Sequence, residues 1–417
     1  MKFTKEEKSW IMYDWANSAY SLIIVTAILP IYFKFVAGEA GVSDSASTAF
    51  WAYASSAGTL IVSLTAPILG TIADYRGYKK KLFNIFAICG IIMTFALAFV
   101  PNKSWIALLV VYILSHIGFQ GANIFYDGFL VDVTTDEKAD KISSYGYGLG
   151  YIGSALLFVV VMVLQVTNGF GMIGGTALIR ICFVLTGIWW AGFSVSFFKN
   201  VKQVHSIEYQ KKPIKQSMQR LKNTLKEISK YKEIVIFLIA YFFYIDGVDT
   251  IFTMATAFGM DMGIDSNTLI IILLVVNVVA FPFTILYGRL AKRYGTKPMI
   301  LVAIVVYIGI CIYALFMKTP LDFWILGIMV GTSQGGIQAL SRSYFARMIP
   351  KEKANEFFGF YNIFGKFSAI LGPLIFGYIT HITGKSQYGI ASLIVLFAVG
   401  AVMFGFSKNT VSEEEAK

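Results

Sequence analysis

Charged residues are scarce in this chain. Only 14% of its 417 residues are Asp, Glu, Lys or Arg, whereas 57% are hydrophobic and 16% are aromatic. An ordinary soluble domain carries about a quarter of its residues as charges. The composition therefore excludes a typical soluble globular protein and favours a chain that crosses a membrane several times.

Cysteine is also rare, and the residue patterns of several enzyme classes are missing. Cys89, Cys182 and Cys311 lie in apolar stretches without the spacing of metal ligands, so we expect them to be packing residues. The sequence has no nucleotide-binding loop, and no Ser and His occur at a spacing that suggests a nucleophile activated by a base. We therefore expect no catalytic residue, bound metal or cofactor, and a protein that is not an enzyme.

Hydrophobic segments make up most of the chain, and each is long enough to cross a hydrocarbon core about 30 Å thick as a helix. They form two groups of six: 10–36, 47–73, 82–100, 105–132, 143–166 and 177–198, then 234–258, 268–290, 298–317, 322–347, 357–381 and 388–406. We expect an all-α membrane protein with twelve transmembrane helices in two pseudo-symmetric bundles, over 1–198 and 234–417, the second including a short tail. A cytoplasmic linker over 199–233 joins them.

Basic residues set the expected orientation. The net charge of +11 would suit a nucleic-acid partner, but most Lys and Arg residues fall on one set of alternating loops. The opposite loops hold only Lys34, Lys103, Lys318 and Lys385. Positive charge marks the cytoplasmic side of a membrane protein. We therefore expect a multi-pass protein of the cell membrane, with both termini cytoplasmic and no nucleic-acid partner.

The linker has an amphipathic pattern. Apolar residues recur at helical spacing opposite a basic face: Ile214, Met218, Leu221, Leu225 and Ile228. A helix of this kind lies on a lipid surface. The pattern predicts a linker helix on the cytoplasmic side of the bilayer.

The first hydrophobic segment carries an acidic residue near its start. In YDWANSAY, Asp14 and Asn17 share one helical face with Ser21. An ionisable side chain in a spanning helix costs several kcal/mol unless it faces a bundle interior, a partner charge or a water-filled cavity. We interpret Asp14 as functional; the alternative is that it lies at the interface and only caps the helix start.

Further polar residues are predicted to face a cavity. They follow helical spacing on the fourth and tenth segments and interrupt the seventh and eleventh: His116, Gln120, Asn123 and Asp127; Gln334, Gln338 and Arg342; Asp246 and Asp249; and Lys366. Separate carboxylates and cations suit a zwitterionic solute, whose amine and carboxylate each need an opposite charge. Buried carboxylates also suit proton coupling, and carboxylates with Asn17 or Ser21 could instead hold sodium.

A loop after the second segment reads GTIADYRGYKKK. Its Gly70, Asp74, Arg76 and Gly77 resemble the G-x-x-x-D-x-x-G loop motif of the major facilitator superfamily, with Tyr75 where that family has a basic residue. We expect these four residues to act in gating, since a carboxylate there can meet a helix N-terminus or an arginine of the other half. A weaker copy, GRLAKRYGTK, has Lys292 in place of the acid.

The two halves also repeat one another. With an offset of 215 residues, QGANIFYDGFLVDVTTDEKAD aligns with QGGIQALSRSYFARMIPKEKAN so that Asp127 falls on Arg342 and Asp132 on Arg347. A second alignment places Asp14 on Asp246 and Asn17 on Asp249. The aligned charges could bind solute, or they could pair between the halves as a latch. We favour the latch for Asp132 and Arg347, and solute or proton binding for Asp14, Asp246 and Arg342.

Five strings together resemble the vacuole-effluxer-like branch of the major facilitator superfamily: YDWANSAY, FYDGFL, IDGVDT, GGIQALSRSYFARMIP and FGFYNIFGKFSAILGP. The resemblance covers essentially the whole chain. It implies the major facilitator fold and a central site that contains Asp14, Asn17, Asp127, Asp246, Gln338, Arg342 and Lys366. Fungal members of this branch are associated with export of amino acids from the vacuole, whereas the compact loops here look bacterial.

These observations lead to one functional hypothesis and two alternatives. We expect a monomeric secondary transporter that exports a small polar organic solute, such as an amino acid, by alternating access coupled to protons. The first alternative is efflux of amphipathic drugs or lipid-like molecules. The second is a membrane receptor that has this fold but does not transport.

Overall fold

The computed structural model describes residues 3–167, 175–208, 219, 222–224, 231–367 and 371–407. Throughout these ranges the secondary structure is helical, apart from an isolated parallel bridge between Tyr75 and Ile207. Most of the predicted linker helix and the C-terminal tail lie outside the described residues. The all-α fold class expected from the sequence is confirmed.

The chain divides into two compact units, and each includes a short segment from the opposite half of the sequence. Unit 1 consists of Met1–Val133, Leu149–Ser217 and Glu352–Gly359, and unit 2 consists of Thr134–Gly148, Met218–Lys351 and Phe360–Lys417. The start of the fifth hydrophobic segment therefore packs with unit 2. The start of the eleventh packs with unit 1.

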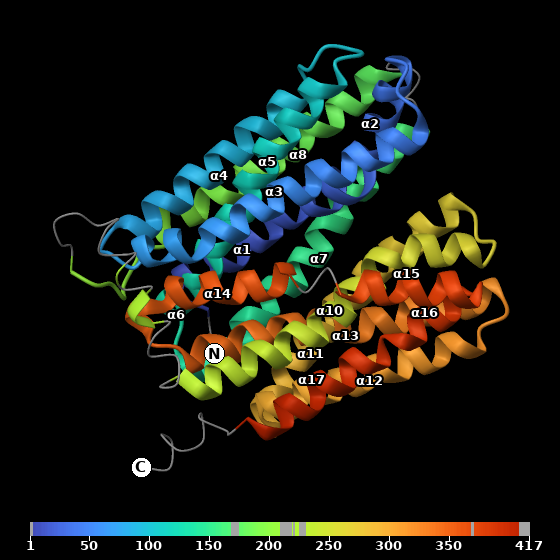
Figure 1. Ribbon diagram of the computed structural model, residues 1–417. Coiled ribbons are helices and arrows are strands. Elements are labelled where there is room, and N and C mark those ends of the chain that lie inside the picture. The colour runs from blue at the N-terminus through green and yellow to red at the C-terminus, as the bar shows by residue number, and fades with distance from the viewer. Residues whose placement is uncertain are drawn as a thin grey trace. The chain divides into compact units, whose positions relative to one another are not determined.

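Unit 1 is built from helices that lie side by side along most of their lengths (Figure 1). Helix α4 packs along α5, and α1 packs along α8. The bounds are α1 (Lys5–Tyr20), η1 (Ser21–Ala27), α2 (Ile28–Glu39), α3 (Asp44–Ala73), α4 (Tyr78–Leu97), α5 (Trp105–Gly128), α6 (Leu130–Val133), α7 (Asp136–Val166) and α8 (Thr176–Asn200). Helix α7 begins in unit 2 and continues into unit 1.

Unit 2 has the same kind of packing. Helix α11 packs along α13, and α10 packs along α17. The bounds are α10 (Lys232–Asp261), α11 (Ser266–Tyr294), α12 (Thr296–Phe316), α13 (Pro320–Met348), η3 (Lys351–Lys353), α14 (Ala354–Phe367), α15 (Leu371–Thr383), α16 (Ser386–Ser392) and α17 (Ile394–Phe406). The eleventh hydrophobic segment corresponds to α14 and α15, and residues 368–370 between them lie outside the described residues.

Eleven helical stretches in the described ranges are long and apolar enough to cross a membrane. The tenth predicted segment corresponds to α13, which is 29 residues long. Its polar residues, among them Gln334 and Gln338, lower its mean hydropathy below that of the other long helices. Those residues belong to the polar stripe that the sequence singled out, so α13 combines the length of a spanning helix with a polar face.

The first span changes its hydrogen-bonding pattern halfway along. The stretch Lys5–Glu39 is helical throughout, but Ser21–Ala27 forms a π-helix, and the amide of Ile28 bonds to the carbonyl of Ile23. Pro30 follows closely and has no amide hydrogen to offer the preceding turn. Such π segments are frequent at functional sites, and this one begins directly after the YDWANSAY stretch.

Local capping fixes where several helices begin. Thr4 and Glu7 form a capping box at the start of α1, and Thr319 and Asp322 form one at the start of α13. Asp265 accepts a hydrogen bond from the amide of Thr268 at the start of α11. Each cap satisfies amides that have no partner inside the helix.

Candidate functional site

Asp246 lies on α10 in the interior of unit 2, with 0% of its surface exposed. Both of its carboxylate oxygens accept a hydrogen bond from the amide of Gly372, each at 2.9 Å. The hydroxyl of Thr250 donates to the same carboxylate at 3.4 Å. Gly372 is the second residue of α15. The carboxylate therefore accepts its hydrogen bonds from a backbone amide and a hydroxyl inside unit 2.

Glycine is required at position 372 because α15 approaches α10 closely. A Cβ there would collide with the Thr250 hydroxyl and lie 2.8 Å from Asp246 Oδ1. A similar contact occurs in unit 1, where a Cβ on Gly150 would lie 2.5 Å from Ser18 Oγ and 3.3 Å from the Asp14 carbonyl. The aligned acids Asp14 and Asp246 thus each lie beside a glycine of another helix.

Asp249 and Lys366 form a second charged pair in unit 2. Asp249 lies one turn after Asp246 on α10, and Lys366 lies in the last turn of α14. The two charges interact electrostatically. Beside them, the rings of Tyr241 and Tyr361 are stacked with their centroids 4.3 Å apart. Unit 2 therefore brings together three of the predicted charged residues and lines their surroundings with tyrosine.

Arg342 is buried on α13, with 2% of its surface exposed. Its Nε donates to Ser143 Oγ at 3.0 Å, and Nη2 donates to the Ser143 carbonyl at 3.2 Å. The guanidinium lies 4.1 Å from the ring centre of Tyr147, a cation–π contact. Ser143 and Tyr147 were not among the predicted site residues. Their four-residue spacing in SSYGYG places them on one helix face, which was the available signal.

Gln334 and Gln338 continue the same region of α13. Gln334 is buried, and its Oε1 atom has no hydrogen-bond partner within the described part of the chain. With Arg342 these residues are spaced by four along the helix and so lie on one face. A buried amide oxygen without a partner is rare in folded proteins. The stripe predicted on the tenth segment thus includes an acceptor that a solute could use.

Unit 1 brings together two of the predicted residues. The side-chain amide of Asn17 on α1 donates to the side-chain oxygen of Asn123 on α5 at 2.6 Å. Asp14 is buried one turn before Asn17 on α1, and Asp127 is half-buried in the last turn of α5. The polar faces of the first and fourth hydrophobic segments therefore meet in the interior of unit 1.

His116 lies on the same face of α5, two turns before Asn123. Its Nε2 lies 3.3 Å from Thr59 Oγ1 and 3.4 Å from Gln120 Nε2, and its ring packs beside that of Tyr112. These contacts hold the imidazole between α3 and α5. They favour a polar packing role for His116.

The loop motif that begins at Gly70 contacts the start of α14 inside unit 1. Asp74 Oδ1 accepts from the amide and the side chain of Asn355 at 2.9 and 3.0 Å, and Oδ2 accepts from the amide of Glu356 at 3.2 Å. A Cβ at Gly70 would collide with the Asn355 carbonyl. Gly77 has a φ of 82°, a conformation that favours glycine. Glycine thus allows the close approach that places the Asp74 carboxylate on a helix N-terminus.

Asp132 and Arg347 each make an ion pair within one unit. Asp132 Oδ2 lies 2.7 Å from Lys79 Nζ in unit 1. Both terminal nitrogens of Arg347 donate to Asp140 at 3.0 Å in unit 2. The alignment of the halves suggested a pair between Asp132 and Arg347. Each residue thus has a partner on another helix of its own unit, and a latch between the halves stays a prediction.

The carboxyl of Asp132 has a lowered pKa. Burial alone would raise that pKa, but the charge of Lys79 and hydrogen bonds from His205 lower it further than burial raises it. Asp132 lies in α6, beyond the apolar span that ends at Gly128. The carboxylate is therefore held in its charged form.

Asp140 was missed by the sequence analysis. It lies on α7 in unit 2 and accepts hydrogen bonds from Thr296 and Ser343, each at 2.6 Å, as well as from Arg347. Thr296 lies in the second copy of the loop motif, directly after Gly295, and Lys292 replaces the acid in that copy. Asp140 thus supplies an acid beside this loop from a different helix.

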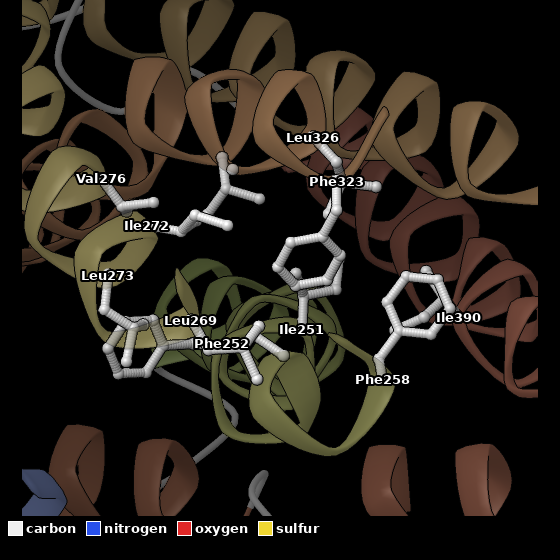
Figure 2. A pocket seen from close by; sticks show the side chains of 13 residues that line it. Ile251, Phe252, Phe258, Leu269, Ile272, Leu273, Val276, Phe323, Leu326 and Ile390 are labelled. Atoms are coloured by element: carbon white, nitrogen blue, oxygen red, sulfur yellow. The ribbon is translucent and has the colours of Figure 1, made fainter. Parts of the chain in front are cut away.

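An apolar cavity of about 40 Å³ lies between α10, α11, α13 and α16. Figure 2 shows that side chains from all four helices line it. Its lining residues are apolar and include Phe252, Leu269, Phe323 and Ile390. The cavity does not include Asp246 or Asp249, which precede its lining residues on α10. Across the described ranges, no cluster of His, Cys, Asp or Glu could hold a metal ion.

Comparison with known proteins identifies the family. The family model described as "Vacuole effluxer Atg22 like" matches residues 3–138 and 131–417. An uncharacterized MFS-type transporter of Bacillus subtilis, YxiO, is 49% identical over 99% of this chain and 97% of its own length. Autophagy-related protein 22 of Kluyveromyces lactis is 24% identical over 78% of this chain and 72% of its own length.

Solved structures support the fold. The human organic anion transporter MFSD10 matches with a TM-score of 0.72 at 12% identity, over 96% of this chain and 99% of that one. The proton:xylose symporter XylE matches with a TM-score of 0.74 at 13% identity, over 97% of this chain and 95% of that one. These proteins are transporters and not enzymes. The chain therefore belongs to the Atg22-like vacuole effluxer family and is a multi-pass transporter of the major facilitator superfamily.

Proposed function

We propose that this protein exports a small polar organic solute, such as an amino acid, by proton-coupled alternating access. The observation that carries the proposal is the set of opposite charges inside unit 2: Asp246 and Asp249 on α10, Lys366 on α14 and Arg342 on α13. A charge in a spanning segment is costly and usually marks a substrate or ion pathway. A solute with both an amine and a carboxylate suits this set.

Each residue has a proposed role. Arg342 binds the solute carboxylate, because a guanidinium can form two parallel hydrogen bonds with it. Asp249 binds the amine in exchange for Lys366. The unsatisfied oxygen of Gln334 accepts a further hydrogen bond from the solute, and Gln338 lies one turn from it towards Arg342.

Asp246 is the proposed proton carrier. As a carboxylate it can accept both hydrogen bonds from the Gly372 amide, and a proton on it would occupy one of those oxygens. Binding and release of the proton would then change how α10 holds the start of α15. In unit 1, Asp14 with Asn17, Asn123 and Asp127 is proposed to contribute a second polar group, by analogy with the aligned acid.

The cellular setting is proposed on the pattern of charges and on the bacterial relative. The protein would lie in the cell membrane with both termini in the cytoplasm, because the loops on that side carry most of the Lys and Arg residues. It would act as a monomer. Protons are preferred to sodium as the coupling ion because Asp246 is held by amide and hydroxyl donors, whereas a sodium site needs several oxygen acceptors.

Counterflow in proteoliposomes tests the substrate class. Vesicles are loaded with unlabelled amino acids, and labelled ones are added singly outside, with and without a pH gradient. We expect exchange with the parent protein and its loss with Arg342→Ala. Arg289→Ala is the matched control, since Arg289 is an exposed arginine on α11, and it should exchange normally. Absence of exchange for every amino acid would contradict the proposed substrate.

The coupling ion needs a separate measurement. Asp246→Asn keeps the size of the side chain but removes the titrating group. We expect this variant to exchange solute across the membrane without a response to the pH gradient. An unchanged pH response would assign the proton to another residue and leave the substrate result standing.

The apolar cavity supports a second candidate, efflux of amphipathic molecules. Such a solute would place its apolar part between α10, α11 and α13. Ala255→Phe would fill the cavity. If cells with this variant retain a fluorescent amphipathic dye that the parent exports, the second candidate gains support; if both export it equally, the cavity has no part in transport.

A further inference from the structure

The residues that follow α8 run back across the loop motif of unit 1. We call residues 202–208 the strap. Gln203 Oε1 accepts from the amide of Gly77 at 2.9 Å, and Gln203 Nε2 donates to the carbonyl of Ala73 at 3.1 Å. One side chain thus contacts the backbone of the motif loop at both its start and its end.

The strap backbone adds two further bonds to the same loop. The amide of Ile207 donates to the carbonyl of Asp74 at 2.8 Å, and the amide of Arg76 donates to the carbonyl of Ile207 at 3.1 Å. These are the bonds of the parallel bridge between Tyr75 and Ile207. The backbone on either side of Tyr75 is therefore fixed by the strap.

The middle of the strap is anchored on α6. Asp132 Oδ1 accepts from the amides of Val204 and His205, at 3.0 and 2.7 Å. Its other oxygen pairs with Lys79 on α4, which also donates to the carbonyl of Gly128. A charged acceptor of this kind strengthens each bond. Asp132 thus connects the strap, through Lys79, to the start of α4 and the end of α5.

The strap and α14 contact opposite parts of one residue. The carbonyl of Asp74 bonds to the strap, whereas the carboxylate of Asp74 bonds to the amides of Asn355 and Glu356. A shift of the Asp74 backbone would move its carboxylate away from the start of α14. We propose that Gln203 is a positioning residue of the transporter: through the strap, the first residues of the central linker hold the Asp74 loop against α14.

This proposal differs from the gating role expected from the motif, because it makes the linker part of the gate. Any motion that pulls the linker reaches the Asp74 contact through hydrogen bonds to the loop backbone. It does not depend on the identity of the solute. It can therefore be tested without a known substrate.

Hydrogen exchange, measured by mass spectrometry on the full chain in lipid nanodiscs, tests the proposal. In Gln203→Ala we expect the amides of Asn355 and Glu356, which Gln203 does not touch, to exchange about tenfold faster, the factor that corresponds to one or two lost hydrogen bonds. Asp74→Asn gives the reference for a lost contact. Lys202→Ala, at an exposed neighbouring residue, should leave these amides unchanged.

A purely local role for Gln203 would give a different result. Faster exchange confined to residues 73–77 and 202–208, with Asn355 and Glu356 unchanged, would overturn the proposal. Amides of α12 in unit 2 should stay protected and report that the variant is folded. If Gln203→Ala does not fold, Gln203→Glu decides the question, because it keeps the acceptor for Gly77 but has no N–H for Ala73. Faster exchange at Asn355 and Glu356 in that variant supports the proposal, and unchanged exchange refutes it.

Discussion

Asp140 and Arg347 form a bidentate ion pair in unit 2, with both N–O distances at 3.0 Å. The two side chains come from α7 and α13, which belong to different halves of the sequence. Thr296 also donates to Asp140 and accepts from Arg347. The pair is nearly buried, with side-chain exposures of 9% and 10%. Its strength should therefore exceed that of a surface pair.

The ion pair gives the first prediction. Asp140→Asn leaves the Arg347 charge without its partner and should lower the stability of the folded protein by roughly 3 kcal/mol. Asp136→Asn is the matched control, because its pair with Lys351 is exposed and should contribute less than about 1 kcal/mol. Both variants are compared by chemical denaturation in detergent. Equal effects would contradict the special role of Asp140.

The contact between α10 and α15 gives a second prediction. Gly372→Ala places a methyl group against Thr250 and Asp246, so it should cost about 1 to 3 kcal/mol of stability and reduce transport. Gly377→Ala lies in the same helix, where a Cβ would meet nothing within 4 Å, and should be neutral or slightly stabilising. Thermal unfolding and a transport assay on the pair separate the contact from helix propensity. Similar behaviour of the two variants would argue against close packing at Gly372.

The hydrogen bond between Asn17 and Asn123 gives a third prediction. Removal of one amide by Asn→Ala leaves the other, which is buried at Asn17 and half-buried at Asn123, without that partner and should cost about 1 to 3 kcal/mol. The double variant should cost less than the sum of the two single ones, because it leaves no orphaned group. A double-mutant cycle measured by denaturation gives the coupling energy directly. Additive effects would show that the 2.6 Å contact contributes nothing to stability.

The lowered pKa of Asp132 gives a prediction about acid. An Asp whose pKa is lower in the folded than in the unfolded protein adds stability above the unfolded pKa, and that stability is lost as pH falls through the folded pKa. The ordinary value is 3.8, so the contribution of Asp132 should decline as the pH falls below about 4. Stability measured from pH 6 to pH 3 should therefore depend less on pH in Asp132→Asn. A stability that depends more steeply on pH in the variant would mean that folding raises the pKa of Asp132 instead of lowering it.

Much of the fold could be predicted because membranes impose simple rules on composition. Hydrophobic length located the spanning helices, and the repeat between YDWANSAY and IDGVDT reported two related halves. The sequence predicted the contacts between individual side chains less well than it predicted the helices. The position of Asp140 beside Thr296 depends on how a helix from one half packs in the other unit, and no spacing in the sequence records that contact.

The loop motif of unit 1 shows the same limit. Its pattern left two partners open for Asp74, a helix N-terminus or an arginine of the other half, and the contacts show the first. The strap could not be predicted, because Gln203 and Ile207 lie in a polar stretch with no periodic pattern. The alignment of Asp132 with Arg347 identifies equivalent positions in the two halves, but it does not predict which residues contact each other. Equivalent positions in a duplicated chain need not bind each other, and here each has an opposite charge within its own unit.

The exchange of segments between the units also constrains how the protein is made. Unit 1 includes residues 352–359, and the Asp74 carboxylate caps α14 only when those residues are present. A ribosome must therefore translate nearly the whole chain before the first unit can complete its packing. Until then the surface around Asp74 and Gly70 that the start of α14 covers stays exposed, so the first unit cannot complete its fold as an independent early domain.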